Sequence, residues 1–78
     1  MTIKMIETLM NIAIAERAKA SMNLNIYLSS GVAIGEHPDI VGEANKLVDE
    51  FATADGKVQA LNGMIDELKA LDEEKNKA

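Results

Sequence analysis

The stretch that decides the fold runs from Pro38 to Glu73 and reads PDIVGEANKLVDEFATADGKVQALNGMIDELKALDE. Its apolar residues recur in alternating steps of three and four, which is the spacing of one face of an α-helix. The face consists of Ile40, Ala44, Leu47, Phe51, Ala54, Val58, Leu61, Ile65 and Leu68. This rhythm predicts one long amphipathic helix over residues 38–73.

Three glycines occur inside the predicted helix, at Gly42, Gly56 and Gly63. By helical spacing, all three lie on the side that points away from the apolar face. Each costs about 1 kcal/mol in helix propensity, but none leaves a gap in the face. The glycines are therefore compatible with one continuous helix.

The apolar face changes its width along the helix. It is widened on one side by Val41 and Val48, and further along on the other side by Met64 and Leu71. The drift of a straight helix against a seven-residue repeat would move the face in the other direction. We therefore leave open a bend or a break near residues 53–56.

A first helix is predicted over residues 3–30, with an apolar line in the same three-and-four spacing. This line consists of Ile3, Ile6, Met10, Ala13, Arg17, Ala20, Leu24 and Tyr27. A second line, Met5, Leu9 and Ile12, lies on another face of the N-terminal half. A helix that is apolar on two sides is usually buried on two sides, and one antiparallel neighbour cannot cover both lines. The second line therefore predicts a core shared between molecules.

Residues 22–29 allow a different interpretation, because apolar and polar residues alternate there as in a β-strand. No nearby segment offers a partner strand of comparable length. We therefore favour the helix.

A loop at residues 31–37 is predicted to join the two helices. Gly31 is suited to the position just past a helix C-terminus, and Pro38 to the first position of the next helix. Asp39 would then complement the positive end of the second helix. Residues 74–78 are predicted to be a charged, frayed tail, and the chain forms one domain over residues 1–78.

Arg17 is the one charged residue on the apolar line of the first helix. A polar residue at such a position often sets the register between two helices. We expect a salt bridge from Arg17 to Glu43 or Glu50 on the second helix.

The composition limits the classes of function. The chain has 78 residues, no cysteine and a net charge of −5. Disulfides are excluded, and a small chain without them is often stabilised by oligomerisation. The acidic balance opposes binding to nucleic acid and to anionic membranes. The longest apolar-rich stretch, residues 3–15, is too short and too polar to span a bilayer. We expect a cytoplasmic protein.

Polar side chains gather before the second helix, at Glu36, His37 and Asp39, with Glu43 one turn further on. A zinc site would need more imidazole or thiolate ligands, and an acid–base pair would need a pocket. We interpret the cluster as a helix entry that Glu36 or His37 caps; a small metal site or active site is the alternative. We therefore predict no catalytic, metal-binding or cofactor-binding residue, and no enzyme.

The sequence SSGVAIGEHPDIV at residues 29–41 resembles the loop between the helices of small uncharacterised helical proteins of tailed phages of marine bacteria. The likeness covers this loop and the following helix, about half of the chain. That group has no established activity. The resemblance implies a phage accessory protein acting in the cytoplasm of a bacterial host.

We therefore expect an all-α antiparallel hairpin that associates into a helical bundle, with a dimer favoured. The predicted oligomer interface consists of Ile3, Met5, Ile6, Leu9, Met10, Ile12, Leu61, Ile65 and Leu68. The predicted function is that of a non-enzymatic interaction or assembly module that binds another protein. The alternative is a nucleic-acid-linked regulator acting as a helical dimer, although the lysines and Arg17 do not line up on one face.

Overall fold

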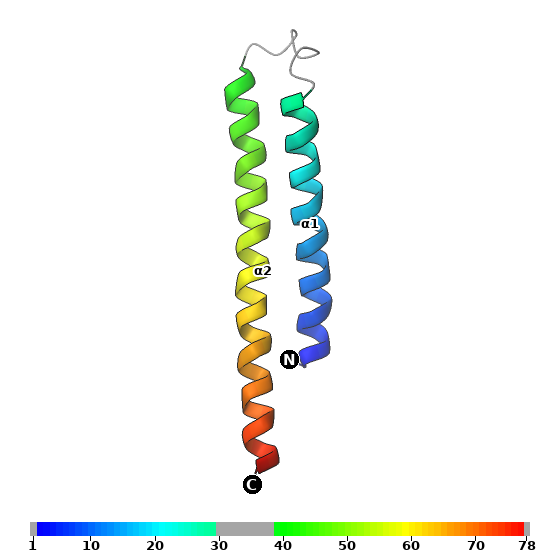
Figure 1. Cartoon of the computed structure of the whole chain (residues 1–78), viewed down its shortest axis with the longest axis vertical. Coiled ribbons are helices and arrows are strands. Elements are labelled where there is room, and N and C mark those ends of the chain that lie inside the picture. The colour runs from blue at the N-terminus through cyan, green and yellow to red at the C-terminus, as the bar shows by residue number, and fades with distance from the viewer. Residues whose placement is uncertain (1, 30–38, 78) are drawn as a thin grey trace.

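The protein is a hairpin of two long antiparallel helices, as the computed structural model of the chain shows (Figure 1). The structure describes residues 2–29 and 39–77. Helix α1 spans Ile3–Ser29, with 27 residues, and helix α2 spans Ile40–Lys77, with 38 residues. The C-terminal end of α2 projects beyond the N-terminal end of α1 (Figure 1). The predicted all-α helical hairpin is confirmed.

Helix α2 begins at Ile40, two residues later than the predicted start at Pro38. Asp39 is the reason, because its carboxylate accepts a hydrogen bond of 3.0 Å from the backbone N–H of Gly42. A side chain that accepts from the third helical residue marks the N-cap, so Asp39 precedes the helix instead of belonging to its first turn.

The other described helix ends lie close to the predicted ones, with one exception. Thr2 caps α1 by accepting a hydrogen bond of 3.2 Å from the N–H of Met5, and α1 ends at Ser29. Helix α2 continues to Lys77, whereas we predicted fraying from residue 74. The last residues include glutamates and lysines, which favour helix and so allow it to continue.

Helix α2 is continuous through residues 53–56, where the sequence left open a bend or a break. After a break, Asp55 would be suited to cap the new helix. Its carboxylate instead accepts hydrogen bonds of 2.9 Å from Arg17 and from Gln59. Residues 22–29, which also suited a strand, are helical. Contacts with the neighbouring helix outweigh the local preference for alternation or for a break.

The core is a single seam between the two helices. On α1, all eight residues of the predicted apolar line are buried or half-buried. Of the nine residues of the predicted apolar face on α2, only Ile40, at the first helical position, is exposed. The described residues that are buried are Ile6, Ala13, Ala20, Ala54 and Ile65. Three of these five are alanines, so the hairpin buries little apolar surface by itself.

The dimensions of the hairpin show the same shortage of core. Its principal extents are 65 × 17 × 15 Å, and its radius of gyration is 18.2 Å, against about 11.5 Å for a compact chain of this length. Its accessible surface is 5995 Å², whereas a compact monomer of 8.4 kDa exposes about 4,600 Å². The single hairpin thus exposes about 1,400 Å² more surface than a compact protein of its size.

The three glycines of α2 lead to a prediction about stability. A Cβ at Gly56 or Gly63 would meet nothing within 4 Å, so alanine there should raise the free energy of unfolding by up to about 1 kcal/mol each. At Gly42 a Cβ would lie 2.6 Å from Cγ of Asp39, so the cap would have to move. Urea unfolding should show a smaller gain, or a loss, for Gly42→Ala. Equal gains at all three positions would contradict this account of the cap.

Candidate oligomerisation face

Two ion pairs define how the helices are aligned. Arg17 donates a hydrogen bond of 2.9 Å to Asp55, and Nζ of Lys57 lies 3.6 Å from a carboxylate oxygen of Glu16. The prediction that Arg17 pairs with Glu43 or Glu50 was therefore wrong. Both glutamates lie more than one helical turn along α2 from the level of Arg17. The sequence pattern defines the seam of each helix but not the register between them.

An apolar strip runs along one side of the hairpin, where side chains of both helices meet. Leu9 and Ile12 of α1 line a groove with Ala60, Leu61 and Met64 of α2. Met5 extends the face of α1 by one turn and Leu71 extends the face of α2 by two turns, with the exposed Glu67 between Met64 and Leu71. We call this set the apolar strip: Met5, Leu9, Ile12, Ala60, Leu61, Met64 and Leu71.

The strip is exposed in the single hairpin. Relative exposure is 55% for Met5, 44% for Leu9, 52% for Ile12, 50% for Met64 and 56% for Leu71. Isolated exposed apolar residues are normal, but Leu9, Ile12 and Met64 line one groove together, and a set of this kind marks an interaction surface. The strip is therefore the strongest candidate for a functional surface among the described residues.

The predicted interface residues divide between the seam and the strip. Met5, Leu9 and Ile12 lie exposed on the strip, and half-buried Leu61 lies between seam and strip. The remaining members pack in the seam of the hairpin itself and are buried or half-buried. They are Ile3, Ile6, Met10, Ile65 and Leu68.

Three members of the strip were not among the predicted interface residues. In the sequence, Met64 and Leu71 stand out only as a widening of the apolar face of the second helix. That widening was the signal, because it lies on the side that faces Leu9 and Ile12 once the helices pair. Ala60 carried no signal of its own, since alanine is common on any face of a helix.

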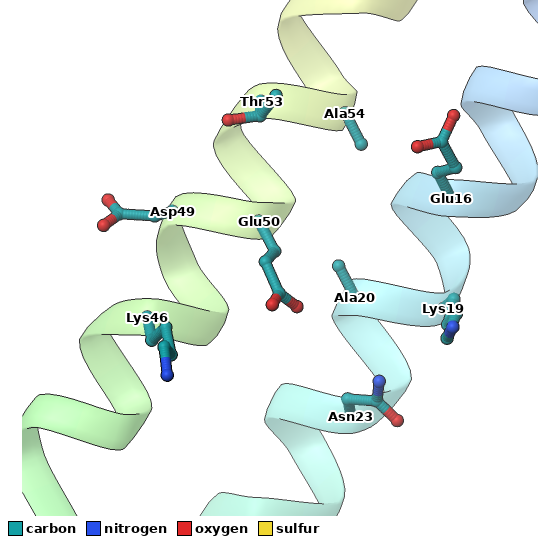
Figure 2. A pocket seen from close by; sticks show the side chains of 9 residues that line it. All are labelled: Glu16, Lys19, Ala20, Asn23, Lys46, Asp49, Glu50, Thr53 and Ala54. Atoms are coloured by element: carbon teal, nitrogen blue, oxygen red, sulfur yellow. The ribbon is translucent and has the colours of Figure 1, made fainter.

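The strip ends at the Glu16–Lys57 pair, and beyond that pair the same side of the hairpin becomes a polar cleft (Figure 2). Figure 2 shows the side chain of Glu50 reaching from α2 toward α1, while Asp49 points away from α1. We call this surface the polar cleft: Glu16, Lys19, Ala20, Asn23, Lys46, Asp49, Glu50, Thr53 and Ala54. Its lysines lie among carboxylates, so it offers mixed charges instead of a basic patch for phosphate.

The polar cluster predicted at the helix entry lies partly outside the described residues, because it includes Glu36 and His37. Its other members are on α2 or at its start: Asp39 is the N-cap, and Glu43 follows in the first turn. Among residues 2–29 and 39–77, no group of three or more histidine, cysteine, aspartate or glutamate side chains is arranged to hold a metal ion.

Tyr27 connects the two helices at the loop end of the hairpin. Its hydroxyl donates a hydrogen bond of 3.4 Å to the carbonyl oxygen of Ile40. Partial burial raises the pKa of Tyr27 above its usual value, and the negative charges of Glu43 and Asp39 raise it further. The ionised phenolate is therefore disfavoured in the folded state.

This environment can be tested by spectrophotometric titration, because Tyr27 is the single tyrosine of the chain and there is no tryptophan. We expect the midpoint above pH 10 in the folded protein. Since the unfolded chain releases this proton first, stability should fall as the pH rises above about 10. Glu43→Gln should lower the pKa of Tyr27 part of the way towards its usual value. Glu50→Gln, two helical turns further along α2, should leave this pKa unchanged. Identical curves for all three proteins would contradict this assignment.

Comparisons of the chain with protein-family models, curated proteins and solved structures found no match. Neither described helix combines the length and the apolar character needed to cross a membrane.

Proposed function

We propose that the chain is a non-enzymatic, homo-oligomeric helical protein that serves as an interaction or assembly module. Two hairpins would pack through their apolar strips into a four-helix bundle, in which each strip is covered by the other. The observation that carries the proposal is the exposure of Leu9, Ile12 and Met64 side by side on two helices.

The size of the exposed surface supports this proposal. An interface of standard size removes about 800 Å² of accessible surface from each partner. The hairpin exposes about 1,400 Å² more than a compact monomer would, so one such interface fits within the excess. The small core of the hairpin supports it too, because five buried residues, three of them alanines, provide little stability without further burial.

A wider role follows from the rest of the surface. The polar cleft carries charged and amide groups outside the strip, which would leave it available to a different protein after assembly. The resemblance of residues 29–41 to phage proteins extends the proposal to a phage accessory protein in the cytoplasm of a bacterial host.

Analytical ultracentrifugation tests the central claim. At micromolar concentration the protein should sediment as a dimer, and dilution should lower its helical circular dichroism together with the dimer fraction, since folding and association are linked. A monodisperse monomer that keeps its helicity and melts at a concentration-independent temperature would overturn the proposal.

A further inference from the structure

We infer that the strip is covered by a second copy of the chain that lies antiparallel to the first and is shifted along it, so that strip covers strip. This inference rests on the proposed function, because it specifies how the two hairpins of the dimer are arranged. It follows from where the strip and the polar cleft lie along the hairpin.

The strip occupies one half of the hairpin only. It is built from the N-terminal half of α1 and the C-terminal half of α2, whereas the polar cleft occupies the half nearer the loop. A parallel second copy would place strip on strip but also cleft on cleft. It would take Glu16, Lys46 and Glu50 of both copies out of water, and such desolvation is costly.

An antiparallel second copy centred on the middle of the hairpin would be no better. It would lay the strip of each copy on the polar cleft of the other, which leaves apolar side chains against charged ones. Only an antiparallel copy centred on the strip buries both strips and leaves Lys46 and Glu50 of both clefts in water. It covers fewer charged groups than either alternative: the Glu16–Lys57 pair at the end of the strip and Glu67 within it.

The helical rise predicts the resulting contacts. Ala60 and Leu71 mark the two ends of the strip on α2, and they are about 16 Å apart along the helix. With the two-fold axis midway between them, Leu71 of one copy lies level with Ala60 and Ile12 of the other. The two copies of Leu71 are then about 16 Å apart.

The charges at the ends of the strip favour the same arrangement. Glu74 lies about one turn beyond Leu71, and Lys57 lies about one turn before Ala60. The antiparallel copy therefore brings Glu74 level with Lys57 of the other chain, which joins the existing Glu16–Lys57 pair. A parallel copy would instead place each Glu74 level with its own counterpart and far from Lys57 of the other chain, so this pairing of opposite charges would be lost.

Cysteine crosslinking tests the arrangement, because the natural chain has no cysteine. Leu71→Cys and Ile12→Cys are made separately in chains of different length, mixed by unfolding and refolding, and treated with a crosslinker shorter than 16 Å. Cysteine is small and tolerates apolar burial, so both variants should remain dimers in ultracentrifugation. We expect a crosslinked product that contains one chain of each kind, and little product from either variant alone.

The outcomes separate the inference from the proposed function. Strong crosslinking of Leu71→Cys to itself would show a parallel dimer and overturn the inference, as would a dimer without the mixed product. Either result leaves the proposed dimer standing, whereas a monomer in ultracentrifugation overturns both. Val48→Cys, on the other side of the hairpin and 46% exposed, is the control and should not crosslink to Leu71→Cys.

Discussion

Met64→Glu will weaken self-association by at least 100-fold. Met64 is half-exposed in the single hairpin and lies near the centre of the strip, where a second copy would cover it. A carboxylate buried there without a partner costs about 3–5 kcal/mol, and each 1.4 kcal/mol is a factor of ten in the dissociation constant. Sedimentation equilibrium over a range of concentrations measures the change directly.

Met22→Glu is the matched control for this prediction. Met22 is the same residue type, is 63% exposed and lies on α1 outside the strip. Its replacement should leave the dissociation constant within a factor of about two, because a charge on a surface in contact with water has little cost. Equal weakening by the two substitutions, or a Met64→Glu protein that dimerises normally, would show that the strip is not the interface.

Ile6→Ala will have the largest effect on folding, a loss of about 2–5 kcal/mol in the free energy of unfolding. Ile6 is 4% exposed and belongs to the seam, whose buried side chains are few. The hairpin has few other buried side chains, so the neighbours of Ile6 cannot repack to fill the cavity and the loss is poorly compensated. Urea unfolding followed by helical circular dichroism, at one fixed protein concentration, measures it.

Ile26→Ala provides the comparison, because Ile26 lies on the same helix and is 59% exposed. Its truncation removes the same atoms but little buried surface, so the change should stay below about 1 kcal/mol. A loss at Ile26 as large as the loss at Ile6 would contradict the seam described here and would place Ile26 in an interface instead.

The two helices and their seam could be predicted from sequence because both depend on local periodicity. Apolar steps of three and four select one face of a helix, and every seam residue except Ile40 is at least half-buried as that pattern requires. The start of α2 was misplaced by two residues, because both Pro38 and Asp39 suit a helix entry and only the bonded geometry shows that Asp39 is the cap.

The candidate site was predicted only in part. The sequence indicates that Met5, Leu9 and Ile12 do not pack within the hairpin, because one neighbouring helix cannot cover two faces. Ala60, Met64 and Leu71 were not included, since their proximity to those residues depends on how α2 is aligned with α1.

The sequence by itself thus determined the helical class, the seam-facing residues of both helices and the presence of apolar residues that the seam does not need. The tertiary structure decided the register, which pairs Arg17 with Asp55 and Glu16 with Lys57. Through that register it also decided which exposed residues of the two helices form one strip. The physical reason is that a helical repeat defines the direction in which a side chain points, whereas its level against the neighbouring helix depends on packing and charge between segments distant in the chain.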